Sequence, residues 1–463
     1  MVGNKLREVF TMKPRNLCCL LLTLCLLLGG CAQAAPADPP AGPIGWPQYP
    51  EMAPYPNEMG YVNEDSGEFD GDGFADSYSA WRESQQAQYN QPEGYADTLT
   101  GFFRDSIPVF LGAAEGNAAC SPLNIYMALA MLAEVTGGTS RQQLMDVLNA
   151  GDIAALRTQA EHVWNAHYCA DGASACLLAN SLWLEEGLTY DPDAIQKLQV
   201  LYHAASYQGD LGTPEMDGLL RSWLNEQTDG LLEDQIQGVS MDPQTILALA
   251  STIYYRAKWS NEFAEQNNTQ GSFHTPAGEQ EVTFMNTTLT YGPYWWGENF
   301  GAVNLPLEDG SRMWLVLPDE GKTPADVLSS GKALELILGS WSETENQKSL
   351  RVNLSLPKFD IVSDVQLNDS LRRLGITEVF DAGTADFTTL IPQENCWLDR
   401  VQHAARVAID EEGVTAAAYT VMMTCGAARP PEEEIDFILD RPFLFLITSR
   451  DNLPLFAGVV EQP

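Results

Sequence analysis

Several stretches of residues 93–463 are apolar at nearly every position, which predicts strands buried in the interior of a sheet. Residues 177–184 form such a run around Asn180, and residues 247–259 and 443–447 form two more. Continuous apolar runs of this length are typical of strands whose two faces are both covered. The chain is therefore expected to contain a central, covered sheet.

The apolar segment at residues 120–132 predicts a buried helix instead of a strand. Ser121 is a plausible N-terminal cap, and Pro122 suits the first turn of a helix. The Gly-Gly-Thr-Ser run at residues 137–140 ends this helix, and a second helix is expected through Leu148.

Residues 413–420 have the pattern of a loop that can become a strand. Successive side chains of a strand point to opposite faces of a sheet. One face here carries only uncharged side chains of modest size, namely Val414, Ala416, Ala418 and Thr420. The run of alanines also fits a helix within a linker, but Gly413 before it and the Pro430-Pro431 pair after it disfavour a regular helix. The segment is predicted to be able to enter between two existing strands.

Two motifs near the C-terminus resemble the hinge and the C-terminal signature of the serpin family. They are Glu411-Glu412-Gly413 followed by small residues, and Arg441-Pro442 followed by an apolar strand. Further segments match family landmarks in the same order, at residues 120–132, 177–184, 223–230, 247–259, 313–318, 354–359, 371–376, 380 and 385–387. The resemblance covers residues 93–463 and implies one α+β serpin domain with three β-sheets, about nine helices and an exposed reactive-centre loop at about residues 411–436.

The resemblance implies that this loop is bait for a serine or cysteine protease and that the protein is not an enzyme. The protease attacks one peptide bond and becomes acylated, the cut loop inserts into the central sheet, and deacylation fails. The expected function is that of a suicide inhibitor acting as a monomer. The alternative is a non-inhibitory serpin-fold surface binding protein. A hydrolase is disfavoured, because the sequence has no Gly-x-Ser-x-Gly, His-Glu-x-x-His or phosphate-loop motif.

The family's usual loop length, counted from Gly413, places the attacked bond between Ala427 and Ala428, within two or three residues. A small residue there suits proteases with a small apolar primary pocket, elastase-like or subtilisin-like. Arg429 would suit a trypsin-like protease, but Pro430 follows it and disfavours cleavage. Cys425 in the same loop is the expected reactive thiol.

The resemblance also assigns residues that control the opening of the central sheet. Ser121, Asn180 and His403 correspond to a polar cluster beneath the sheet, and Lys358 and Glu411 to a salt bridge where insertion begins. Taken alone, these residues also fit a helix cap, a buried amide, a core histidine and two solvated charges. The hinge itself comprises Glu411, Glu412, Gly413, Val414, Thr415, Ala416, Ala417 and Ala418.

The hinge departs from the family's usual pattern at two positions. Val414 stands where Thr or Ser is usual, and Tyr419 stands where a small residue is usual. Val suits a strand, and Tyr419 falls on the outward-facing set, so the inhibitory interpretation is kept.

The N-terminus predicts export and lipidation. Basic residues precede an apolar core at residues 17–28, which is too short to span a membrane, so residues 1–30 are interpreted as a signal peptide. Leu28-Gly29-Gly30-Cys31 resembles the bacterial lipoprotein cleavage box, which implies a lipid on Cys31. An ordinary secretory peptide cleaved near Ala35 is the alternative. The protein is thus expected at the extracellular face of the bacterial cell membrane, or secreted.

Residues 31–92 are rich in Pro, Gly, Tyr and acidic residues and show little apolar periodicity, which predicts a flexible tether. The acidic residues at 68–76 offer oxygen atoms as a calcium loop would, but the bidentate Glu at the twelfth position is missing. A solvated linker is the preferred interpretation, and no metal or cofactor is expected.

The formal net charge of −38 comes from 63 acidic against 25 basic residues. Such an excess disfavours nucleic acid, heparin-like polyanions and anionic headgroups as partners. The membrane contact is therefore expected through the lipid on Cys31 alone.

Nine cysteines include five in the folded part, namely Cys120, Cys169, Cys176, Cys396 and Cys425. The odd number leaves at least one thiol unpaired within the chain. Cys169 and Cys176 flank a short polar loop that could close a disulfide in an oxidising compartment, and whether they do so stays open. The Cys and His spacings do not suggest zinc.

Overall fold

The computed structural model describes residues 43–463 apart from 64–65, 113–115, 234–235, 340–345, 393–394, 415–430 and 432. All of them belong to one compact unit at residues 42–463. Cys31, the hinge beyond Val414, Cys425 and the expected bond between Ala427 and Ala428 lie outside the described residues.

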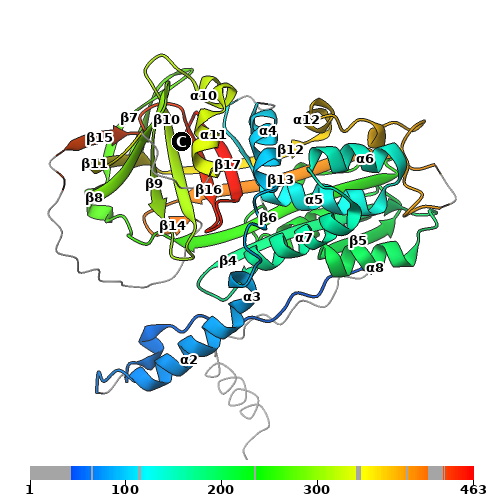
Figure 1. The fold of residues 1–463 in the computed structure, drawn as a ribbon, viewed down its shortest axis with the longest axis horizontal. Helices are drawn as coiled ribbons and strands as arrows, with labels where there is room; N and C mark the ends of the chain where they lie inside the picture. Colours follow the sequence, from blue (N-terminus) through cyan, green and yellow to red (C-terminus); the bar gives the residue numbers. More distant parts are fainter. Residues whose placement is uncertain are drawn as a thin grey trace, which may run out of the picture. The chain divides into compact units, whose positions relative to one another are not determined.

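The larger apolar runs form one mixed sheet of eight strands (Figure 1). Its order is β1-β5-β4-β6-β14-β13-β12, and β3 pairs with β4. The strands are β1 (Pro43–Gly45), β3 (Cys169–Ala170), β4 (Ala175–Glu185), β5 (Ala204–Gly209), β6 (Leu247–Lys258), β12 (Phe359–Gln366), β13 (Arg400–Ile409) and β14 (Gly413–Val414). The runs at residues 177–184 and 247–259 are β4 and β6, as predicted.

The other strands form a nine-stranded sheet in the order β15-β11-β8-β9-β10-β16-β17-β2, with β7 paired to β8. The strands are β2 (Ala118–Cys120), β7 (Thr269–Thr275), β8 (Gly278–Trp296), β9 (Phe300–Pro306), β10 (Arg312–Pro318), β11 (Gln347–Pro357), β15 (Glu434–Ile438), β16 (Phe443–Thr448) and β17 (Pro454–Val460). The long β8 pairs with both β11 and β9, so it joins the second and third expected sheets into one hydrogen-bonded network. The α+β architecture is confirmed.

Nine α-helices lie beyond residue 92 in the part of the chain that the structure describes. They are α4 (Leu99–Leu111), α5 (Pro122–Val135), α6 (Gly138–Val147), α7 (Ile153–His167), α8 (Pro192–Leu201), α9 (Pro214–Glu226), α10 (Pro324–Ser330), α11 (Lys332–Leu338) and α12 (Asn368–Arg373). Short 3-10 helices are η2 (Ile236–Gly238), η3 (Glu265–Asn267) and η4 (Glu378–Phe380). Every residue of α5 is buried, and α5 contacts β4, β6 and β17. The predicted buried helix is therefore confirmed.

The cap of α5 explains how its apolar sequence becomes a helix at a defined residue. The Oγ atom of Ser121 accepts a hydrogen bond from the backbone N–H of Asn124 at 3.2 Å, and Pro122 occupies the first turn. The carboxylate of Glu134 in the last turn pairs with Arg157 of α7 at 2.6 Å and accepts a hydrogen bond from Tyr202 at 3.2 Å. Both ends of α5 are thus held by polar contacts.

Residues 43–92, where the composition predicts a flexible tether, carry regular elements in the structure. They are β1, η1 (Glu58–Tyr61), α2 (Gly71–Ser84) and α3 (Gln86–Tyr89). Strand β1 extends the eight-stranded sheet by pairing with β5. The ring of Tyr49 stacks on the rings of Trp164 and Tyr168, with centroid distances of 6.2 Å and 5.7 Å. Isolated aromatic anchors of this kind have no sequence period, which is why the pattern of residues did not reveal them.

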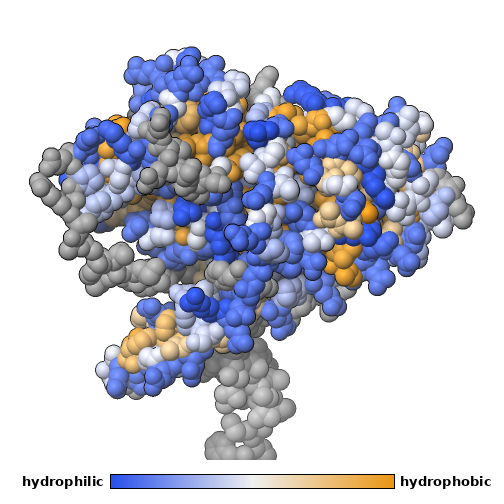
Figure 2. Space-filling model, viewed as in Figure 1, coloured by the Kyte–Doolittle hydropathy of each residue, from blue (hydrophilic) through white to orange (hydrophobic). Residues whose placement is uncertain are grey.

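The acidic segment at residues 68–76 begins helix α2. The side chain of Asp70 accepts a hydrogen bond from the backbone N–H of Gly73 at 3.0 Å and so caps the helix. Within the described ranges, no group of three or more His, Cys, Asp or Glu residues is arranged to hold a metal ion. None of the described helices is long and apolar enough to cross a membrane. Figure 2 shows a largely hydrophilic face with several apolar patches, one of them over α2.

Candidate functional site

The site is the seam between strands β6 and β13. The two strands pair directly, in parallel, only from Ala248 and Arg400 to Thr252 and Ala404. Towards the other end of the seam the strands diverge, and β14 lies between them. Val414 is paired with Ala257 of β6 on one side and with Ile409 of β13 on the other. The first two residues of the predicted insertion segment thus already occupy the sheet.

Both residues of β14 are buried, for different reasons. Val414 is 1% exposed and belongs to the main hydrophobic core. A Cβ atom at Gly413 would collide with the backbone carbonyl of Ala257. Gly413 is therefore required by close backbone approach, and an apolar side chain suits the next position.

A tight turn leads the chain from β13 into β14. The backbone N–H of Asp410 donates to the carbonyl of Gly413 at 3.1 Å. The carboxylate of Asp410 accepts hydrogen bonds from the N–H groups of Glu412 at 2.9 Å and Gly413 at 3.1 Å. This local side-chain cap reverses the chain within four residues.

Trp259, at the end of β6, holds the turn against the sheet. Its indole Nε1–H donates to the carbonyl of Asp410 at 2.8 Å, and its backbone N–H donates to the carbonyl of Glu412 at 2.9 Å. The side chain is 2% exposed. The indole and the main chain therefore hold the same turn from the β6 side.

Lys358 and Glu411 lie together at the turn, as the resemblance implies. Lys358 precedes β12, and its Nζ atom is 2.5 Å from Oε1 of Glu411. Asn268 donates a short hydrogen bond to the same carboxylate. Burial acts to raise the pKa of Glu411, but the bonds from Lys358 and Asn268 outweigh it, so the pKa is lowered. Asn268 was not predicted from the sequence.

His403 bridges the seam at the level where β6 and β13 pair directly. It lies opposite Ser251 and is fully buried. The backbone N–H of Ser121 donates to Nε2 of His403 at 2.9 Å, and Nδ1 lies 2.8 Å from Oγ of Ser251. Because an amide N–H can only donate, Nε2 is the accepting nitrogen and Nδ1 carries the proton that is donated to Ser251. Burial lowers the pKa of His403 to about 3, so the imidazole is neutral at physiological pH.

Asn180 joins this cluster through a residue that the sequence analysis missed. Its Nδ2 atom donates to Oδ1 of Asn124 at 3.2 Å, and Nδ2 of Asn124 donates to the carbonyls of Thr252 at 2.7 Å and Ala179 at 3.3 Å. Asn124 is fully buried in helix α5. A polar residue inside an otherwise apolar helix was the available signal, because a buried amide needs hydrogen-bond partners.

The cluster therefore ties α5, β4, β6 and β13 together beneath the seam. A second bond across the seam runs from Oγ1 of Thr252 to the carbonyl of Ala404, at 3.1 Å. Separation of β6 from β13 must break both this bond and the bond between Ser251 and His403. The arrangement can hold the sheet closed and yet be opened by breaking a small number of hydrogen bonds.

Comparisons with known proteins bear on this arrangement. A family model described as "Serpin (serine protease inhibitor)" matches residues 110–463. Serpin-Z1A of Triticum aestivum is 29% identical over 368 residues, which cover 76% of this chain and 91% of that protein. An uncharacterized serpin-like protein of Thermococcus kodakarensis is 30% identical, with 76% of this chain and 82% of that protein covered. Leukocyte elastase inhibitor of Homo sapiens is 27% identical, with 78% and 98% covered.

Solved structures have the same fold. The thermophilic serpin tengpin in its native state gives a TM-score of 0.70 at 24% identity, over 81% of this chain and 95% of that chain. Serpin48 of Tenebrio molitor gives a TM-score of 0.67 at 21% identity, over 81% of this chain and 99% of that chain. At these identities the likeness concerns the fold alone.

The buried imidazole of His403 predicts a pH-dependent loss of stability. The pKa is 6.5 for an ordinary histidine and about 3 for His403, so between these values the unfolded chain binds a proton more readily than the folded chain. The contribution of His403 to the free energy of unfolding is therefore fully present above pH 6.5, and it is lost as the pH falls towards 3. The contribution is about 1.4 kcal/mol per pH unit at most. Urea unfolding of the wild type and of His403→Gln at several pH values between 4 and 7.5 measures it.

We expect His403→Gln to lower stability at neutral pH but to flatten its dependence on pH. His274→Gln is the matched control, because it removes an exposed imidazole outside the seam and should keep the wild-type slope. Equal slopes for the wild type and His403→Gln would contradict the assigned neutral imidazole.

Proposed function

The chain belongs to the serpin family, and we propose that it is a suicide inhibitor of serine proteases. The observation that carries the proposal is the position of β14, whose residues Gly413 and Val414 lie between β6 and β13 where these strands diverge. This position supports the proposal, because it is where insertion of the loop would begin. The protein itself catalyses no reaction in this proposal.

In the proposed mechanism, a protease attacks a bond in the loop and becomes acylated. The freed loop then extends β14 along the seam and separates β6 from β13. The insertion breaks five parallel residue pairs and the bonds from Ser251 to His403 and from Thr252 to Ala404. It replaces them with antiparallel pairing on both sides of a new strand, which satisfies more backbone groups than it breaks. The acylated protease moves with the loop, and its deacylation fails.

The register of β14 supports insertion of the following residues. Val414 pairs with Ala257 in an antiparallel ladder, so continuation would place Ala416 opposite Tyr255 and Ala418 opposite Ile253. These small side chains would share the buried face of Val414. No charged residue or proline interrupts the alternation up to Thr420. The departure at Val414 is compatible with the role, because this side chain is accommodated in the core.

We further propose that the attacked bond is Ala427–Ala428 and that the target has a small apolar primary pocket. Small side chains at this position suit elastase-like or subtilisin-like enzymes. The name of the human relative, leukocyte elastase inhibitor, is in keeping with this class of target. The alternative is a non-inhibitory binding protein, and the first experiment below distinguishes it from an inhibitor.

The proposed place of action is the outer face of the cell membrane. A lipid on Cys31 would supply the attachment, since the net charge of −38 opposes attraction to anionic headgroups.

The purified protein should form a covalent complex with elastase or subtilisin that survives denaturing electrophoresis. Intact mass should also show a released peptide that begins at Ala428. Ala427→Glu should abolish the complex with elastase, because a carboxylate does not suit a small apolar pocket. Cleavage in the loop without a complex and without a rise in melting temperature would identify a non-inhibitory serpin.

The substitution Ala416→Arg should turn the inhibitor into a substrate. In the proposed register this side chain enters the buried face as the loop inserts, where an unpaired charge costs about 3–5 kcal/mol and slows insertion by about a hundredfold to a few thousandfold. The fraction of protease trapped per cleavage, from densitometry of the gel, measures the effect. Glu412→Arg is the matched control, since the same side chain is added at an exposed neighbour and trapping should persist. Equal trapping by both variants would contradict insertion at β14.

Cys31→Ser should release the protein from the membrane fraction of the producing cell and abolish labelling by a fatty-acid analogue. The control is Cys25→Ser, which changes a thiol inside the segment interpreted as the signal peptide and should leave labelling intact. Undiminished labelling of Cys31→Ser would rule out the proposed anchor.

A further inference from the structure

Most of the polar contacts between residues 50–88 and the body of the protein are made at one short hairpin. This receiving hairpin comprises residues 168–176, with β3 and the start of β4 as its arms. The hydroxyl of Tyr168 donates to the carbonyl of Pro50 at 3.1 Å, and the N–H of Ala170 donates to Sδ of Met52 at 3.3 Å. Outside the hairpin, Arg450 donates to Oε1 of Gln88 at 3.4 Å, and α3 packs against α7. The conformation of the hairpin therefore matters for much, though not all, of the docking.

Asp171 in the turn of the hairpin makes the central contacts. Its carbonyl accepts the N–H of Tyr55 at 2.8 Å, and its carboxylate accepts Nε1–H of Trp81 at 2.9 Å. The other carboxylate oxygen accepts the N–H groups of Ala173 and Ser174 at 3.0 and 2.8 Å, which shapes the turn. Asp171 is 2% exposed. The turn thus positions the carbonyl and the carboxylate of Asp171 for two partners from the N-terminal segment.

One arm of the hairpin is held by little backbone pairing. Strand β3 has two residues, and the N–H of Asp171 reaches the carbonyl of Ser174 at 3.4 Å. The other arm is the start of β4, which pairs with β6, and Arg256 donates to the carbonyl of Gly172 at 2.8 Å. A two-residue arm is marginally stable alone, so the receiving hairpin has a weak point in β3, at its base.

Two thiols stand at that base. Cys169 and Cys176 are direct partners in the antiparallel register, and both are free thiols in the structure. Directly opposed residues have Cα atoms about 4.5–5.5 Å apart, which lies within the range that a disulfide spans. Both side chains lie on one side of the hairpin, because partners across antiparallel strands share a face.

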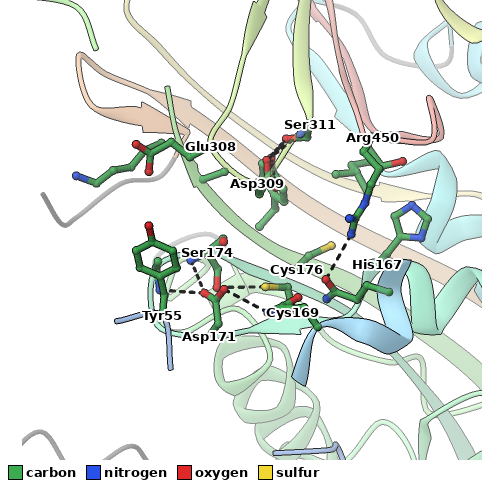
Figure 3. A pocket seen from close by; sticks show the side chains of 18 of the residues that line it. Tyr55, His167, Cys169, Asp171, Ser174, Cys176, Glu308, Asp309, Ser311 and Arg450 are labelled. Carbon is green, nitrogen blue, oxygen red and sulfur yellow. Dashed lines mark hydrogen bonds between the residues drawn. The ribbon is translucent and has the colours of Figure 1, made fainter. Parts of the chain in front are cut away.

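The thiols also line a cavity of about 260 Å³ (Figure 3). The N-terminal segment contributes Tyr55, Tyr78 and Trp81 to its wall, and the body contributes Asp309 and Arg450. Cys169 is partly exposed as a residue and lines the cavity, so a small reagent that enters the cavity can approach its side chain. The cavity therefore places an accessible thiol beside a buried one, beneath the segment that the hairpin holds.

We propose that Cys169 and Cys176 form a redox site whose disulfide fixes the receiving hairpin and thereby secures the docking of residues 50–88. In the dithiol form the hairpin opens more often, and the N-terminal segment is released more often. This inference concerns the docking of that segment and does not depend on protease inhibition.

The reaction is a thiol–disulfide exchange with a low-molecular-weight disulfide such as oxidised glutathione. The thiolate of Cys169 attacks the disulfide and expels one thiol, and Cys176 then displaces the second thiol from the mixed disulfide. The protein loses two protons and two electrons, which reduce the small disulfide to two thiols.

The surroundings of the two thiols make this exchange slow. Burial, with the carboxylates of Asp171 and Asp309, raises the pKa of Cys169 to about 12. Burial, with Cys169 and Asp309, raises the pKa of Cys176 as well. The thiolate is the reacting form, so the rate should rise about tenfold per pH unit between pH 7 and 9.

The test compares the oxidised and reduced forms of Cys425→Ser, in which the loop thiol cannot interfere. After incubation with oxidised glutathione, intact mass should show the loss of two hydrogens, and peptide mapping should link Cys169 to Cys176. Amide hydrogen exchange should then be slower by about tenfold to a hundredfold in residues 169–176. Amide hydrogen exchange should also slow at Tyr55 and in helix α2.

Two outcomes overturn the proposal. A protein that gains no internal disulfide under these conditions has no redox site here. A disulfide that leaves exchange in residues 50–88 unchanged does not secure the docking. The double variant Cys169→Ser/Cys176→Ser should show the amide hydrogen exchange of the reduced form with or without the oxidant. The control is Cys120→Ser, which alters a thiol that is 3% exposed and should respond to the oxidant as Cys425→Ser does.

Discussion

The seam between β6 and β13 is the constraint on which the rest of this structure depends. It must be closed enough to shield the core and open enough at one end to admit β14. The closed part is short, five residue pairs, and is reinforced by the bond of His403 to Ser251. A neutral imidazole can serve both the sheet and helix α5, because one nitrogen donates and the other accepts. The structure thus concentrates its resistance to opening in a few directional bonds.

Helix α5 transmits this arrangement to the rest of the body. Its cap presents the N–H of Ser121 to His403, and its Asn124 bonds the carbonyls of Ala179 and Thr252, on β4 and β6. The far end is held by Glu134 and Arg157. A helix buried on all sides cannot shift without breaking these contacts. Polar atoms in an apolar layer therefore define which arrangement of the sheet is stable, since unmet buried hydrogen bonds are costly.

Much of this could be predicted from the sequence, because strong periodic signals determine it. The apolar runs predicted β4, β6 and β16, the Ser-Pro cap predicted α5, and the resemblance brought Lys358 and Glu411 together. Asn124, Ser251 and Asn268 were missed, because a single polar residue in an apolar run does not reveal its partner across the fold. The docking of residues 43–92 was missed for a related reason, since Tyr49 and Trp81 act as separate anchors and belong to no repeating pattern.

Strand β1 changes the distance over which a lipid on Cys31 could act. If residues 31–92 were all free, the domain could move some 200 Å from its point of attachment, at about 3.5 Å per residue. Because Pro43 already pairs within the sheet, only residues 32–42 separate Cys31 from the folded body. A chain of that length extends to about 40 Å at most. The folded body of an anchored molecule would therefore begin within about 40 Å of the bilayer, and only proteases that approach the membrane surface would encounter the loop.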